Sequence, residues 1–176
     1  QNTAANDLNV TGYVDIATAS TLQMHFGNNK SDSSGTDALA NSGIVITGAI
    51  GQANATTMVR GGTLNLTGTT SAANDLTGAL TANGHVMLTA FSVTGGTGGA
   101  DVGTAMTATL GSDANDNIDI TTITVSGGTG GATDGGGAST LTVTGVLVDP
   151  SGGITLNGGV SAAAVGGDAN MTVTPA

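Results

Sequence analysis

The stretch that bears most directly on the fold is a near-repeat in the second half of the chain. Residues 91–100 read FSVTGGTGGA, and residues 123–132 read ITVSGGTGGA, 32 positions later. Each copy is a short alternating apolar stretch, typical of a strand, that runs into a glycine-rich loop. A solenoid needs about three or more stacked units of constant period, and the sequence shows two copies. The repeat therefore favours two similar hairpin loops within one β-sandwich over a solenoid.

Strand patterns of the same kind extend through the rest of the chain. Apolar residues alternate with small polar ones, and Gly, Asn and Asp interrupt the alternation at spacings of roughly 8–12 residues. Such spacing predicts an all-β fold, a β-sandwich or jelly roll of Ig-like or pilin-like type. We expect residues 21–176 to form this single domain and residues 1–20 to form an N-terminal extension. The predicted strands are 8–16, 22–26, 43–50, 56–60, 63–66, 75–80, 85–93, 105–110, 118–126, 139–148, 153–156 and 171–174.

Composition excludes several classes of protein. The 176 residues carry a formal net charge of −10, with Lys30 and Arg60 as the only Lys or Arg. A protein that binds nucleic acid must neutralise phosphates with many Lys and Arg, so we expect no nucleic-acid partner. No apolar run approaches the roughly 18 residues of a membrane helix, so we expect no membrane span. The absence of Cys excludes a disulfide framework and thiolate chemistry.

The chain begins with Gln1 in a short run of small polar residues. This start suggests that a signal peptide has been cleaved, and a trimmed chain would look the same. Together with the scarcity of cations, it predicts an extracellular or cell-surface location.

Few residues are suited to catalysis. His25 and His85 are the only histidines, and each lies in a predicted strand where a role outside catalysis is the simpler interpretation. The Asp residues cluster beside Gly and Asn, which turns explain without any paired-carboxylate chemistry. The sequence therefore predicts no catalytic site and argues against an enzyme.

The densest group of oxygen ligands lies between two predicted strands. Asp113, Asn115, Asp116 and Asn117 follow one another closely, and Asp119 comes two residues later. Side chains and carbonyls of this kind bind Ca²⁺ at close spacing. The string resembles the Asp-x-Asn-Asp-Asn segment of calcium-binding cadherin linkers, which implies calcium as a cofactor. An Asx-turn without metal explains the same residues, and both interpretations stay open here.

The N-terminal segment carries a regular amphipathic pattern. Leu8, Val10, Gly12, Val14 and Ile16 share one face of a predicted strand. The pattern resembles the donor strands of chaperone–usher-type pilins and related fibre subunits. That resemblance implies that these five residues fill an open groove in the next subunit, with Gly12 allowing close packing. The alternative is that the segment is the first strand of its own sheet.

These observations lead to a functional hypothesis and two alternatives. We expect a structural subunit of an extracellular filament, pilus-like or part of a biofilm matrix, that polymerises head to tail by donor-strand complementation. Its partner is then another copy of itself, and its acidic surface would bind divalent cations or surface glycans. The alternatives are a monomeric β-sandwich adhesin or calcium-binding cell-surface module, and an S-layer-type lattice protein.

Overall fold

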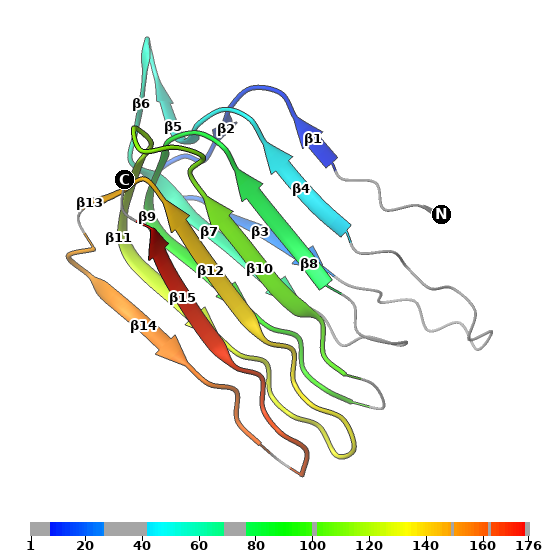
Figure 1. Cartoon of the computed structure of the whole chain (residues 1–176). Helices are drawn as coiled ribbons and strands as arrows, with labels where there is room; N and C mark the ends of the chain where they lie inside the picture. The colour runs from blue at the N-terminus through cyan, green and yellow to red at the C-terminus, as the bar shows by residue number, and fades with distance from the viewer. Residues whose placement is uncertain are drawn as a thin grey trace.

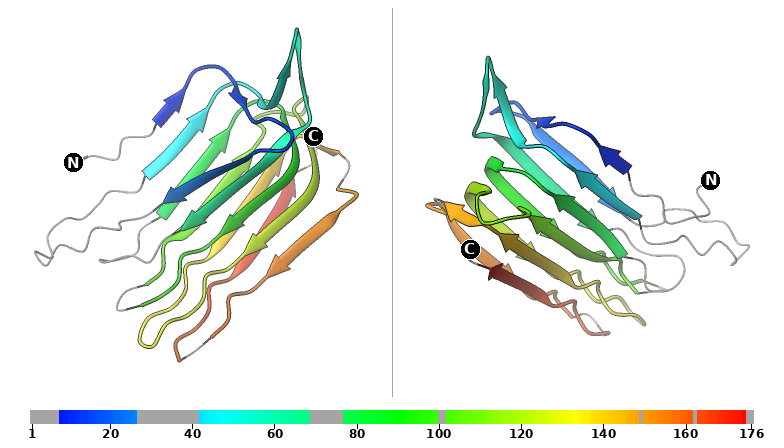
Figure 2. Two further views of the ribbon diagram at one scale, coloured as in Figure 1. Left: turned by 180° about the vertical axis from the view of Figure 1, so that it is seen from behind. Right: turned by 45° about the horizontal axis from the view of Figure 1, so that its top comes forward.

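We analysed a computed structural model of the chain, which describes residues 8–26, 42–68, 77–99, 102–148, 150–161 and 163–174. These residues form fifteen β-strands and no helix. The strands build two sheets that face each other (Figures 1 and 2). We call them sheet A and sheet B.

Sheet A consists of six strands that are parallel throughout. After β1, the chain passes through sheet B before it forms each further strand of sheet A. In spatial order they are β1 (Leu8–Val10), β4 (Ser42–Ile46), β8 (Thr77–Ala82), β10 (Ala105–Leu110), β12 (Ser139–Thr144) and β15 (Ala169–Thr174).

Sheet B has five levels, and neighbouring levels are also parallel. A level is either one long strand or two shorter strands that lie end to end in the sheet. The levels are β2 (Val14–Asp15) with β3 (Thr21–Phe26), β5 (Ile50–Asn54) with β7 (Gly61–Gly68), β9 (Val86–Thr94), β11 (Asn117–Ser126), and β13 (Val146–Val148) with β14 (Gly153–Asn157). One antiparallel hairpin, made by β5 and β6 (Thr57–Val59), projects from the second level.

This arrangement is a β-solenoid, and the predicted β-sandwich or jelly roll was wrong. A sandwich of that kind joins antiparallel strands by hairpins, whereas here the chain crosses from one sheet to the other and returns one level further along. The near-repeat is itself a consequence of the coils, because Phe91 and Ile123 are paired neighbours in β9 and β11. Its two copies are successive levels of sheet B, and the predicted hairpin loops are the segments that lead back to sheet A.

The core fills the space between the two sheets. Alternate residues of each strand point inward and stack on the equivalent residues of the next level, as the burial pattern of β12 shows. One column in sheet A consists of Leu8, Ile44, Leu80, Ala108, Leu141 and Met171, and the next consists of Val10, Ile46, Ala82, Leu110, Val143 and Val173. Members from the middle of both columns are fully buried. The hydrophobic core therefore runs along the stack as continuous aliphatic columns.

At one margin of the stack the core gives way to packed glycine backbone. We call this region the glycine bundle; it comprises residues 95–98, 103, 127–131, 135–137, 159 and 166–167. There Gly159 donates to the carbonyl of Gly167, Gly167 to Gly128, Gly128 to Gly137 and Gly137 to Gly96, at N–O distances of 2.7–2.9 Å. These hydrogen bonds link chain leaving sheet B with chain returning to sheet A. Most of the described glycines of the glycine-rich loops are thus packed inside the stack.

Candidate assembly surface

The five residues predicted to form the donor face belong to the first coil of the stack. Leu8 and Val10 lie in β1, paired with β4, and Val14 lies in β2, paired with β5. Gly12 lies between the two strands with φ at +130°, in the left-handed region that favours glycine, and it turns the chain from sheet A to sheet B. The five residues therefore do not form one strand face: Ile16 is buried in the core, whereas Leu8 is 60% exposed.

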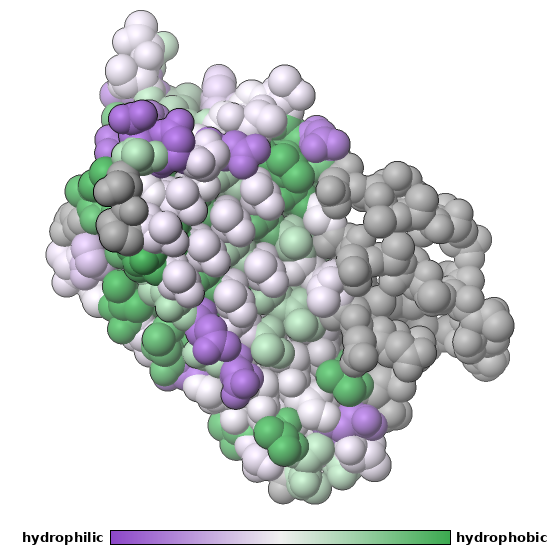
Figure 3. Space-filling model, viewed as in Figure 1, coloured by the Kyte–Doolittle hydropathy of each residue, from purple (hydrophilic) through white to green (hydrophobic). Residues whose placement is uncertain are grey.

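Large exposed hydrophobic side chains gather at the ends of the stack. Among the described residues, the middle coils contribute none and the last coil contributes the majority. At the first coil they are Leu8 and Tyr13, and at the last coil they are Val146, Val148, Ile154, Leu156, Val160, Val165 and Val173. Figure 3 shows the same contrast, with a neutral face over β8, β10 and β12 and hydrophobic side chains along the margin where β14 and β15 lie.

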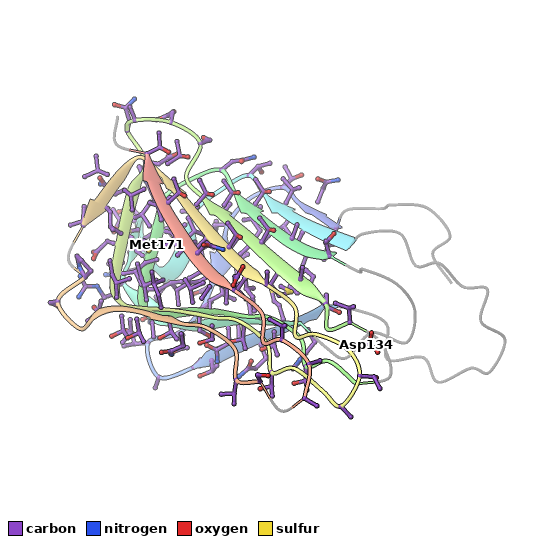
Figure 4. The ribbon with its side chains drawn as sticks, turned by 60° about the horizontal axis from the view of Figure 1, so that its bottom comes forward. Asp134 and Met171 are labelled. Carbon is purple, nitrogen blue, oxygen red and sulfur yellow. The ribbon has the colours of Figure 1, made fainter. Side chains whose placement is uncertain are left out.

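The last coil also ends the hydrogen-bonded ladders. β15 pairs with β12 and β14 pairs with β11, and the far edge of each has no partner among the described strands. Met171, which is labelled in Figure 4, is the last member of its column. Val173 ends the neighbouring column and is 41% exposed. An open edge with unpaired backbone and apolar columns is a template for another strand. We call this surface, formed by β13, β14 and β15, the terminal face.

The predicted calcium ligands lie in the turn between β10 and β11, where their side chains have other partners. The Asp116 carboxylate accepts hydrogen bonds from the Ser112 N–H at 2.7 Å, the Ser112 hydroxyl at 3.1 Å and the Asp113 N–H at 3.2 Å. Asp113 accepts from the Asn115 N–H at 2.6 Å. This is the Asx-turn pattern that was the alternative to a metal site.

The remaining members of that group diverge from the turn. Asn117 begins β11, and its N–H donates to Nδ1 of His85 at 2.9 Å. Asp119 lies on the outer side of β11 and forms an ion pair with Arg60. Within the described ranges, no three His, Cys, Asp or Glu side chains gather into a metal-binding group. Calcium binding stays a prediction.

The Asp116 carboxyl has a shifted pKa. Burial alone would raise its pKa, but hydrogen bonds from Ser112 and Asp113 and the nearby His85 ring outweigh burial, so the pKa lies below its ordinary value. A lowered folded-state pKa stabilises the fold above the ordinary range for Asp, near pH 4, and that contribution is lost as pH falls through the folded pKa.

We therefore expect Asp116→Asn to reduce the loss of thermal stability between about pH 5 and pH 2. The readout is the melting temperature by circular dichroism at each pH. Asp168→Asn is the matched control, since Asp168 is exposed and lies outside the turn between β10 and β11. Equal pH profiles for the two variants would contradict the role given to Asp116.

The two histidines lie apart from each other. His25 is exposed on β3, whereas its neighbours Met24 and Phe26 are partly or fully buried. His85 precedes β9 and its Nδ1 lies 3.8 Å from a carboxylate oxygen of Asp116. That neither acts in catalysis stays a prediction.

None of the described residues form a helix long and apolar enough to cross a membrane. Comparison with protein families, with curated proteins and with solved structures finds no match to this chain. The functional argument therefore rests on the geometry of the stack and its two ends.

Proposed function

We propose that this protein is a structural subunit of an extracellular filament, and that copies join head to tail by stacking the first coil of one on the terminal face of the next. The observation that carries the proposal is that, among the described residues, large exposed hydrophobic side chains are confined to the two ends of the stack. Elsewhere the outward-facing positions of sheet A are mostly Thr and other small residues, as in β10 and β12.

The parallel architecture supports an open assembly. All strands of sheet A run in one direction, so a second copy stacked in the same orientation extends the ladder without reversing it. The two joined surfaces differ from each other, which makes the contact heterologous, and such a contact generates filaments when its rotation does not close. Burying an aliphatic side chain fully contributes about 1.5–3 kcal/mol, so several half-exposed ones at one end are a substantial driving force.

The composition agrees with a place outside the cell. The chain has no Cys to maintain in a reduced state, and its charge of −10 keeps the sides of neighbouring filaments apart. We propose an extracellular or cell-surface location on these grounds.

We expect Val173→Asp to abolish filaments, because it places a carboxylate on the inward column of β15 where the next copy would pack. Thr107→Asp is the matched control, since it adds the same charge to the exposed outer side of β10 in the middle of the stack. Negative-stain electron microscopy of both variants and the unchanged chain gives the filament yield.

Filaments from the unchanged chain and from Thr107→Asp, with monomers from Val173→Asp, would support the proposal. Monomers from all three would overturn it and favour the monomeric adhesin or calcium-binding module. Flat two-dimensional arrays would favour the S-layer-type lattice.

A further inference from the structure

Sheet A has one more stacked level than sheet B. The first described strand, β1, and the last, β15, both lie in sheet A, and the chain alternates between the two sheets from one to the other. Sheet A therefore has six strands, whereas sheet B has five levels. β1 and β15 lie at opposite ends of the stack (Figure 1).

This difference decides how two copies can join. Suppose that β1 of one copy were simply added to β15 of the next. Sheet A would then continue from one copy to the other, but sheet B would lack one level at the junction. The side chains of Ile154 and Leu156 on β14 would then stay uncovered at the junction. Both sheets continue without a gap only if β1 and β15 share a single position.

We propose that copies join by strand replacement: β15 of one copy pairs with β4 of the next, in the position that β1 occupies within a single chain. This inference rests on the filament function proposed above and specifies its interface. Register along the columns then places Met171 on Ile44 and Val173 on Ile46.

The same replacement makes sheet B continuous across the junction. β14 of the first copy meets β3 of the next, which places Ile154 on Leu22 and Leu156 on Met24. Leu22 and Met24 are partly buried aliphatic residues already packed against the core. Three exposed side chains of the terminal face, those of Ile154, Leu156 and Val173, thereby gain apolar partners.

β15 fits the position on β4 better than β1 does. β1 pairs with only Ile44–Ile46 of the five-residue strand β4, and its Leu8 is 60% exposed. β15 has six residues, enough to pair along the whole of β4. Additional backbone hydrogen bonds and a third inward apolar side chain, that of Ala169, favour the exchange.

Engineered cysteine pairs test the proposal in the full-length chain, which has no cysteine of its own. Thr172 lies on the outer side of β15, between the inward-facing Met171 and Val173, and strand replacement places it beside Val45 of the next copy. Within one copy these two residues are four strands apart, about 19 Å, too far for a disulfide. After replacement they are adjacent, about 4.8 Å between Cα atoms.

We therefore expect mild oxidation of filaments of the T172C/V45C variant to give a ladder of covalent multimers on a non-reducing gel. The matched variant T172C/N9C places its second cysteine on β1, which is the neighbour of Thr172 only if β1 simply adds to β15. A ladder from T172C/V45C and none from T172C/N9C supports strand replacement. A ladder from T172C/N9C alone overturns strand replacement while leaving head-to-tail filaments intact, whereas absence of filaments from the unchanged chain overturns both.

Discussion

Gly128→Ala is expected to lower the free energy of unfolding by more than about 3 kcal/mol, a large fraction of the roughly 5–15 kcal/mol that stabilises an ordinary folded protein. Gly128 lies within the glycine bundle, donates to Gly137 and accepts from Gly167. A Cβ at this position would overlap the carbonyl of Gly96 and lie 2.8 Å from the carbon of Gly95. These are backbone atoms of the neighbouring level, so no rotamer change relieves the overlap.

Gly158→Ala provides the control for this prediction. Gly158 also belongs to a glycine pair that follows a strand of sheet B, but a Cβ there meets no atom within 4 Å. We expect its melting temperature to stay near that of the unchanged chain, as for surface substitutions in general. Circular dichroism across a thermal ramp measures both variants. Equal stability of the two would contradict the packed glycine backbone.

Phe91→Ala is expected to destabilise the fold by about 3–5 kcal/mol. Phe91 lies in β9, at the middle of the stack, and is 1% exposed. Its ring packs between the sheets in a core made mostly of aliphatic side chains, with Phe26 as the other buried aromatic residue among the described ones. Its removal leaves a cavity that rigid ladders on both sides cannot close.

Two further substitutions provide controls for the loss of unfolding free energy expected in Phe91→Ala. Phe91→Leu retains most of the apolar volume and should cost less than Phe91→Ala. Tyr13→Ala removes a ring of similar size that is 60% exposed, and we expect a change within about 0.5 kcal/mol. Denaturant titration gives the three free energies, and a loss at Tyr13 as large as that at Phe91 would contradict the position of the core.

The sequence predicted the strands well and their arrangement poorly. Predicted strands at 105–110 and 118–126 coincide with β10 and β11 to within one residue, because alternation of apolar and polar residues reports local burial. The same alternation arises in a sandwich and in a solenoid, so it does not reveal which strands are neighbours. Pairing along sheet A connects residues 36, 36, 28, 33 and 30 positions apart. This varying coil length leaves only one visible repeat, that of β9 and β11.

The candidate site was predicted in part. Regular spacing from Leu8 to Ile16 drew attention to the first coil, but the turn at Gly12 divides that segment between two sheets. The terminal face was missed, since Ile154 and Leu156 alternate with polar residues as the core residues of β9 and β11 do. Only their place at the end of the stack makes them exposed, and local sequence holds no signal for that.

The most direct test of end-to-end assembly is cryo-electron microscopy of the filaments formed by the unchanged chain. Stacked coils place the strands across the filament axis, so we expect a meridional layer line near 4.8 Å. Five levels per copy with strand replacement give an axial rise of about 24 Å per subunit, whereas simple addition of β1 to β15 would give about 29 Å. Filaments without the 4.8 Å spacing along their axis, or no filaments at all, would contradict the stacking of coils from copy to copy.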